Sequence, residues 1–167
     1  ADQTWWYDPG KKGYTSFAKQ GPQYGVVAKS APQAVAKANG DIATLLTQGI
    51  RPELAAECQS SVRPVTVSGS YVVGSGAVNA TNASDFRATV HMDAITLDIA
   101  KGLLSEFDLG AKGKRDVLAI SLSATDYVGH AFGTAGPEMC MQLRALDKGV
   151  GDLLDTLKAR GNPFTVV

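Results

Sequence analysis

An acidic and an imidazole side chain that could bind one metal ion follow an apolar run at residues 117–122. These are Asp126 and His130, four residues apart. One helical turn or a tight loop would aim both side chains at a common point. A carboxylate oxygen and an imidazole nitrogen form a mixed ligand pair that suits Zn²⁺, and Gly129 would let the backbone pass close to the ion. The spacing indicates a candidate metal site at these two residues.

Two ligands do not complete a zinc site, because zinc normally has three or four protein donors. On spacing alone, the alternative is a solvated aspartate beside a histidine that is hydrogen-bonded within a loop. The other histidine, His91, stands between Val90 and Met92 at the end of a predicted strand. We expect His91 to be a core or surface residue and not a ligand.

Two other chemistries use residue types that the chain contains. Ser121 or Ser123 could join Asp126 and His130 in a hydrolase triad, but all four lie within ten positions and neither serine stands in a Gly-x-Ser-x-Gly motif. The sequence 74–76 (Gly-Ser-Gly) lacks the Gly-Lys-Ser/Thr that completes a phosphate-binding loop. We therefore expect neither a serine hydrolase nor a phosphate-binding loop.

The elements that must position Asp126 and His130 form a strand, loop, helix and strand. Residues 117–122 are nearly all apolar, which is typical of a strand buried on both faces of a parallel sheet. A predicted loop at 123–136 leads into a helix that opens at Pro137 and closes at Gly161, and 163–167 begins another strand. This pattern predicts one right-handed βαβ crossover, and ligands of open α/β sheets bind at the loops that leave the strands.

The rest of the chain contains helices and short strands in a less regular order. Trp5, Trp6 and Tyr7 fall in an aromatic, glycine-rich segment at 1–30, which we expect to be irregular and anchored to the body by its rings. The pattern then predicts a helix from Ser30 to Gly49, a helical turn and connector at 51–63, a hairpin at 64–77, a loop at 74–85, a strand at 86–90, and a helix from an Asp93 cap to Phe107. We assign residues 1–90 to an inserted, cap-like region and residues 91–167 to an α/β core segment.

Composition excludes several classes of protein. The 167 residues are 44% hydrophobic and 19% charged, which is typical of one globular domain and not of a disordered chain. Sixteen basic residues balance sixteen acidic ones, so no net charge favours binding to nucleic acid or to an anionic membrane. No apolar run approaches the roughly 18 residues of a membrane span.

Cys58 and Cys140 are too few for a disulfide framework and too far apart for a metal knuckle. We expect two buried thiols, and the alternative is one long-range disulfide in an oxidising compartment. The chain opens at Ala-Asp-Gln-Thr without an initiator methionine or a signal segment. It resembles the inside of a longer chain or a processed product.

The stretch from Asp116 to Gly133 (DVLAISLSATDYVGHAFG) resembles a signature of the alkaline phosphatase superfamily. It is most similar to bacterial periplasmic alkaline phosphatases with a threonine nucleophile, a branch close to type I phosphodiesterases and nucleotide pyrophosphatases. The likeness continues through Gly136-Pro-Glu-Met-Cys-Met and Leu146-Asp-Lys. It extends weakly back to Arg51-Pro-Glu-Leu and the Trp-Trp-Tyr-Asp opening.

The resemblance implies a fold, a cofactor and a reaction. The fold is a three-layer α/β/α sandwich, of which this chain is an internal part with an inserted region of short strands. By position, Asp126 and His130 are two ligands of one of two zinc ions, while the nucleophilic threonine and the remaining ligands lie outside this chain. The implied reaction is in-line displacement at phosphorus, in which the two ions stabilise the attacking and leaving oxygens.

The sequence therefore predicts part of a zinc-dependent alkaline phosphatase that hydrolyses phosphate monoesters and is periplasmic or secreted. A phosphodiesterase or nucleotide pyrophosphatase of the same superfamily is the nearest alternative. The alternative from another class is a non-catalytic α/β binding domain in which Asp126 and His130 have no role. We expect the 167 residues alone to bind zinc poorly and to lack phosphatase activity.

Overall fold

The computed structural model describes residues 3–16, 30–78, 80–111 and 113–167. These residues form two antiparallel hairpins, four α-helices and two 3₁₀ helices. In chain order the elements are β1 (Trp5–Asp8), β2 (Gly13–Ser16), α1 (Gln33–Gln48), the 3₁₀ helix η1 (Ala56–Ser61), β3 (Val65–Val67), β4 (Tyr71–Val73), the 3₁₀ helix η2 (Asp85–Ala88), α2 (Val90–Glu106), α3 (Ala124–Phe132) and α4 (Pro137–Ala159).

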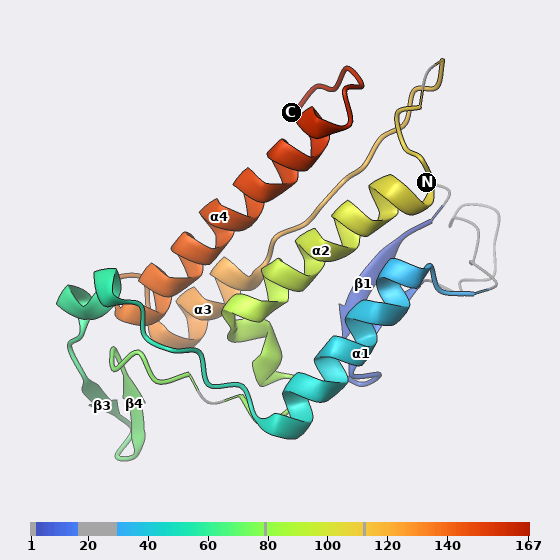
Figure 1. The fold of residues 1–167 in the computed structure, drawn as a ribbon. Helices are drawn as coiled ribbons and strands as arrows, with labels where there is room; N and C mark the ends of the chain where they lie inside the picture. Colours follow the sequence, from blue (N-terminus) through green and yellow to red (C-terminus); the bar gives the residue numbers. More distant parts are fainter. Residues whose placement is uncertain (1–2, 17–29, 79, 112) are drawn as a thin grey trace.

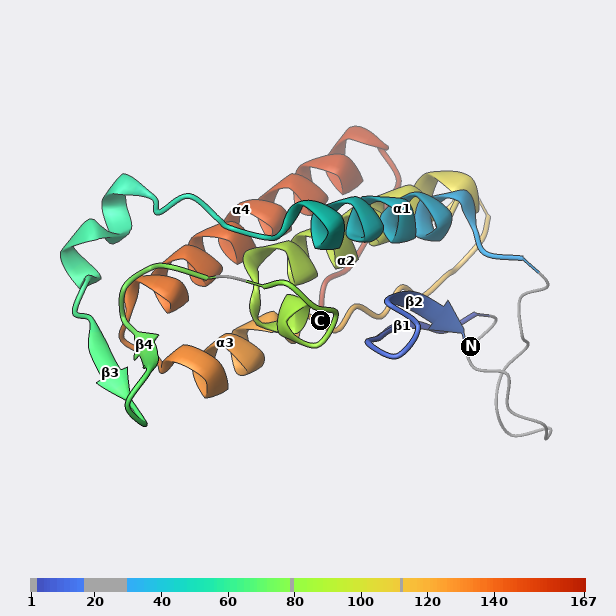
Figure 2. The same cartoon turned by 90° about the horizontal axis from the view of Figure 1, so that it is seen from below.

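Helices α1, α2 and α4 lie side by side in one layer, with α2 in the middle (Figure 1). Figure 2 shows the β1–β2 hairpin, α3 and the extended chain that leads into α3 on one face of this layer. Two glycines of this layer have no room for a larger side chain. A Cβ on Gly102 of α2 would lie 2.4 Å from the Cβ of Ala34 on α1, and one on Gly149 of α4 would lie 2.6 Å from Leu97 of α2. These glycines let the neighbouring elements approach closely.

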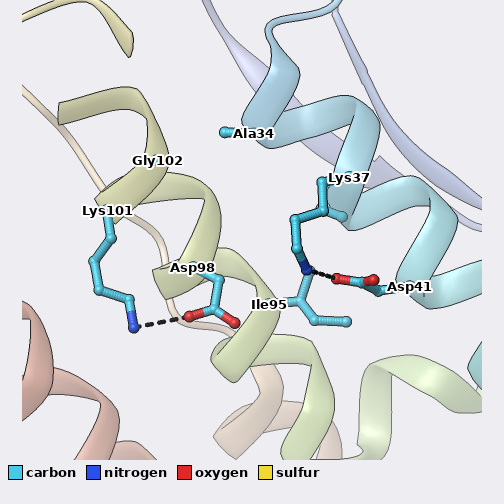
Figure 3. A pocket seen from close by; sticks show the side chains of 8 residues that line it. Ala34, Lys37, Asp41, Ile95, Asp98, Lys101 and Gly102 are labelled. Carbon is cyan, nitrogen blue, oxygen red and sulfur yellow. Dashed lines mark hydrogen bonds and ion pairs between the residues drawn. The ribbon is translucent and has the colours of Figure 1, made fainter. Parts of the chain in front are cut away.

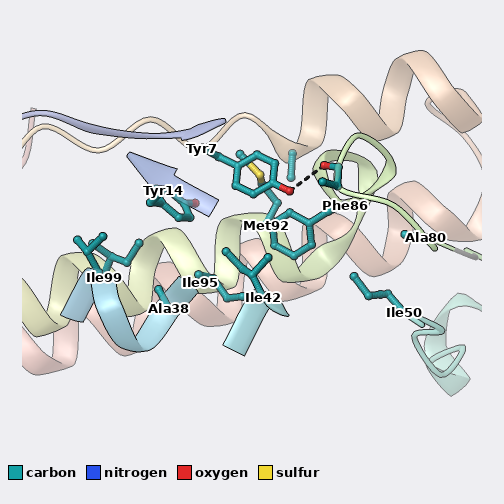
Figure 4. Close-up of a cluster of buried hydrophobic side chains, with 13 residues drawn as sticks. Tyr7, Tyr14, Ala38, Ile42, Ile50, Ala80, Phe86, Met92, Ile95 and Ile99 are labelled. Atoms are coloured by element: carbon teal, nitrogen blue, oxygen red, sulfur yellow. Dashed lines mark hydrogen bonds between the residues drawn. The ribbon is translucent and has the colours of Figure 1, made fainter. Parts of the chain in front are cut away.

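The largest apolar core lies between α1, α2, η2 and the β1–β2 hairpin (Figure 4). Tyr7 is buried in it beside Tyr14 and Phe86, and its hydroxyl donates a hydrogen bond to the Ala83 carbonyl at 2.8 Å. The buried members are Tyr7, Tyr14, Val35, Ala38, Ile42, Ile50, Ala80, Ala83, Phe86, Met92, Ile95, Ile99 and Ala124. Ring anchoring of the N-terminal segment is thus confirmed for Tyr7. The assignment of residues 1–90 and 91–167 to separate regions stays a prediction.

The first half of the chain is more regular than the sequence predicts. The first part of the aromatic segment forms the β1–β2 hairpin. The Asn39 side chain of α1 holds this hairpin: its Oδ1 accepts the Tyr14 N–H at 2.6 Å, and its Nδ2 donates to the Tyr14 carbonyl at 3.0 Å. Residues 17–29 of the segment predicted to be irregular lie outside the described residues. Helix α1 begins at Gln33, after Pro32, and not at a Ser30 cap, but it ends at Gly49 as predicted. The short turn at 56–61 and the β3–β4 hairpin are confirmed.

The predicted strand at 86–90 is wrong, and so is the predicted cap at Asp93. Residues 85–88 form η2, which buries Phe86, and α2 begins at Val90. Asp93 lies inside the first turn of α2, and its buried carboxylate accepts a hydrogen bond from α3 instead of closing its own helix. Three alternating apolar residues are too few to distinguish a strand from a short turn that buries one ring.

The predicted loop at 123–136 contains helix α3, and a loop remains only at 133–136. Residues 117–122 are extended, but within the described residues no strand pairs with them or with 163–167. Leu118, Ile120 and Leu122 pack against α2 and α4, whereas Val117 is 91% exposed. A strand forms a sheet only with a hydrogen-bonding neighbour, and the described segments supply none.

Cys58 of η1 and Cys140 of α4 form a disulfide that spans 82 positions of sequence. The expected pair of free thiols is therefore wrong, and the alternative of one long-range disulfide is confirmed. The bond fastens η1 to α4 beside a small cluster of Cys58, Val78 and Met141. Spacing along the chain carries no information on such a contact, because the two cysteines are brought together by the packing of η1 on α4.

Candidate metal site on helix α3

Helix α3 carries both predicted ligands on one face. Asp126 Oδ1 and His130 Nε2 lie 3.5 Å apart, and the two side chains are 72% and 81% exposed. Val128 and Ala124 occupy the opposite, buried face. The helical spacing of four residues places the pair on one side of the helix, so the structure brings these two groups together.

The separation of the two donor atoms fits a shared ion. Donors about 2.1 Å from one tetrahedral Zn²⁺ lie about 3.4 Å apart. Asp126 and His130 could therefore fill two positions around one ion. Within the described residues, however, no group of three or more His, Cys, Asp or Glu side chains is placed to hold a metal. The pair alone therefore falls short of the three or four protein donors that zinc normally has.

The beginning of α3 is held by buried polar side chains of the helix layer. The Ala124 N–H donates to Asp93 Oδ1 of α2 at 3.0 Å, and Gln142 Nε2 of α4 donates to Asp93 Oδ2 at 2.9 Å. Burial raises the pKa of the Asp93 carboxyl. Hydrogen bonds from Ala124, Gln142 and Ser123 lower this pKa, because they favour the charged form, but their effect is smaller. Sequence patterns missed this contact, because Asp93 is separated from Ala124 by 31 positions.

Two aromatic side chains of α3 contact neighbouring elements. The Arg87 guanidinium of η2 lies 4.6 Å from the centre of the Tyr127 ring, which is a cation–π arrangement. Tyr71 of β4 stacks on Phe132 at a ring separation of 6.3 Å and donates to the Ala131 carbonyl at 3.3 Å. Both η2 and the β3–β4 hairpin are thus fixed against the helix that carries the candidate ligands.

The weaker sequence candidates have structural roles or lie apart from α3. His91 is half-buried in the first turn of α2, where burial lowers its pKa. The Gly76 N–H donates to the buried carboxylate of Glu138 at 2.9 Å, so this glycine loop binds an acid of its own chain. Ser121 lies on the exposed side of the extended segment.

A groove between α1 and α2 offers no comparable chemistry. Its cations are paired within their own helices: Lys37 contacts Asp41 at 2.6 Å and Lys101 contacts Asp98 at 2.8 Å (Figure 3). A second pocket, beside Trp5 and Phe107, is mostly apolar. Helix α3 contributes to neither pocket. Within the described residues, no helix is long and apolar enough to cross a membrane.

Comparison with solved structures defines the class of fold. The chain is similar to a crystal structure of wild-type alkaline phosphatase PafA, with a TM-score of 0.65 and 24% identity, over 93% of this chain and 31% of that one. This similarity confirms the predicted α/β fold class. The helix layer and the extended segment correspond to one part of that larger fold. The type I phosphodiesterase / nucleotide pyrophosphatase model matches residues 4–167, and the chain belongs to that family.

Two curated relatives that match most of the chain are named alkaline phosphatases. Alkaline phosphatase PhoK of a Sphingomonas species is 37% identical over all of this chain and 28% of its own length. Alkaline phosphatase PhoD of Zymomonas mobilis is 33% identical over 81% of this chain and 24% of its own length. The chain thus spans about a quarter of the length of these relatives.

Proposed function

We propose that this chain is the part of a zinc-dependent phosphatase that supplies Asp126 and His130 to one metal ion. The full-length protein would hydrolyse phosphate monoesters. The observation that carries the proposal is the 3.5 Å approach of a carboxylate oxygen to an imidazole nitrogen on one short helix. Family membership and the names of the relatives support a phosphoester substrate.

The two side chains have distinct tasks at such a site. The Asp126 carboxylate provides negative charge, and His130 binds through Nε2 only when that nitrogen carries no proton. A zinc ion held there would stabilise negative charge on a phosphate-ester oxygen. Helix α3 fixes the direction of both groups, since they share one turn of backbone. Further donors and the nucleophile would come from segments outside these 167 residues.

A periplasmic or secreted location belongs to the same proposal. The Cys58–Cys140 disulfide supports it, because such bonds persist in oxidising compartments and are rare in the cytosol. The expected pattern is that the protein isolated from cells contains no free thiol at either position. Quantitative alkylation of both cysteines in freshly isolated protein would contradict the location.

A phosphodiesterase is the second candidate, favoured by the family model that covers residues 4–167. The two activities differ in whether the site accepts a second ester group on phosphorus. The test compares kcat/KM of the full-length protein for a phosphate monoester and a phosphate diester that have the same aryl leaving group. A higher kcat/KM for the diester would show that the protein is a diesterase and not a monoesterase. The proposed metal ligands would be the same in both cases.

The test of the metal site is Asp126→Ala in the full-length protein. We expect loss of bound zinc and a fall in kcat/KM larger than the roughly 10–100-fold that loss of an outer partner causes. Asp155→Ala is the matched control, because Asp155 is a 77% exposed aspartate that pairs only with Lys158 of its own helix among the described residues. Unchanged zinc content and hydrolysis in Asp126→Ala would refute the proposed function.

A further inference from the structure

The N-terminus of α3 is closed by an acid from another helix. The residue before the helix, Ser123, makes no side-chain capping hydrogen bond. Instead, Asp93 Oδ1 accepts the Ala124 N–H at 3.0 Å. Asp93 is 2% exposed and Ala124 is fully buried. The carboxylate thus binds one of the orphan N–H groups that begin every helix, from inside the protein.

The second oxygen of Asp93 ties this contact to α4. Gln142, which is fully buried, donates from Nε2 to Asp93 Oδ2 at 2.9 Å and approaches Thr125 Oγ1 at 3.4 Å. The helices α2 and α4 that carry these two side chains lie side by side (Figure 1). The Asp93 carboxylate of α2 therefore contacts both α3 and α4. It holds the N-terminus of α3, the helix that carries the candidate ligands.

A helix of nine residues is too short to be stable by itself in water. Its direction depends on what holds its ends and its buried face. Asp126 is two residues after Ala124, so a shift of the first turn would move Asp126 directly and His130 one turn later.

We infer that Asp93 is the positioning residue of the metal site: with Gln142, it orients α3 so that Asp126 and His130 face one ion. This inference rests on the proposed function. Partners one step removed from a metal commonly change metal affinity 10–100-fold when they are lost. Asp93 is an unusual partner of that kind, because it acts on the backbone of the ligand helix and touches neither ligand in the described contacts.

Two variants separate the hydrogen bond from the charge. Asp93→Ala removes the acceptor of the Ala124 N–H. Asp93→Asn keeps an acceptor oxygen, and its new amide N–H₂ can donate to Gln142 Oε1 once that side chain rotates, because Oε1 has no partner among the described residues. Glu138→Ala is the matched control. Glu138 is also a 2% exposed acid that accepts a backbone N–H, but that N–H belongs to Gly76 and not to α3.

The experiment uses the full-length protein with three measurements: zinc affinity by chelator competition, kcat and KM at limiting and saturating zinc, and amide exchange of residues 124–132 in the metal-free protein. We expect Asp93→Ala to weaken zinc binding at least about tenfold, to recover kcat with excess zinc, and to accelerate exchange in α3. Asp93→Asn should stay close to the unsubstituted protein in all three measurements. Glu138→Ala should leave α3 exchange unchanged.

Unchanged zinc affinity in Asp93→Ala would overturn the inference, and so would equal losses in Asp93→Ala and Glu138→Ala, which would indicate general destabilisation. If Asp93→Ala does not fold, Gln142→Leu is tested in its place. We expect this variant to bind zinc more weakly, and unchanged zinc binding would contradict the inference. Asp126→Ala distinguishes failure of the positioning role from failure of the proposed function. If that variant keeps its zinc, the proposed function fails; if it loses zinc while the Asp93 variants do not, only the positioning role fails.

Discussion

Two acidic residues of α2 close the beginnings of other helices. Asp93 accepts the Ala124 N–H of α3, and Glu106 accepts the N–H groups of Gln33 and Ala34, at 2.8 and 3.1 Å, where α1 begins. Neither α1 nor α3 has a side-chain cap of its own. Capping rules look for a partner within three or four residues, so they indicated Ser30 for α1, which is wrong, and indicated no cap for α3.

At the residue scale, His91 gives the chain a pH-dependent stability. Burial lowers the pKa of His91 from 6.5, so the unfolded chain binds this proton at a higher pH than the folded chain does. The stability is fully present above pH 6.5 and falls as the pH drops from there towards the folded pKa. We expect His91→Gln to flatten this decline, measured as the urea midpoint of the purified chain across that range. Parallel curves for the two proteins would contradict the prediction.

At the scale of elements, periodicity identified most helices but not their partners. Apolar residues spaced by three and four predicted α1 and α4, because one helical face must meet the core, and Gly49 predicted where α1 ends. Helix α3 was predicted as a loop, since its small residues and glycine form weak local signals and its stability comes from packing and from Asp93. Residues 117–122 have the composition of a buried strand, yet their hydrogen-bonding neighbours are absent from the described segments.

The disulfide is the strongest single link between elements. It joins positions separated by 82 residues, and closing a loop of that length removes chain entropy equivalent to about 4–5 kcal/mol. We expect Cys58→Ala with Cys140→Ala to lower the free energy of unfolding by an amount of this order, measured by urea denaturation. A reductant should destabilise the unsubstituted chain and leave the double variant unaffected. Equal sensitivity of both proteins to the reductant would contradict the prediction.

At the scale of the molecule, several apolar side chains outside the helices are exposed. The extended segment covers α2 and α4 with Leu118, Ile120 and Leu122 but turns Val117 outward, 91% exposed. Phe164 and Val166 near the C-terminus are 42% and 66% exposed. Relatives are more than three times as long as this chain, which spans 28% of one of them. Extended segments with exposed apolar side chains are suited to packing within a larger sheet.

The purified 167-residue chain should therefore bind zinc weakly and show no zinc-dependent turnover of an aryl phosphate. Two donors leave a zinc site one or two ligands short, and no third is placed with them in the described part of the chain. Isothermal titration with zinc and a spectrophotometric phosphatase assay test the two statements. The full-length protein is the positive control, and measurable turnover by the chain alone would show that it contains the missing machinery.

The sequence by itself determined the family resemblance, the pairing of Asp126 with His130 and the faces of the long helices. These properties depend on residues a few positions apart, whose geometry the backbone period fixes. Tertiary structure alone decided that Cys58 joins Cys140, that α3 is a helix and that Asp93 holds its first turn. The Asp93–Ala124 contact joins residues that are 31 positions apart, and the Cys58–Cys140 bond joins residues that are 82 positions apart. They form only when helices pack, so no local pattern of residue types encodes them.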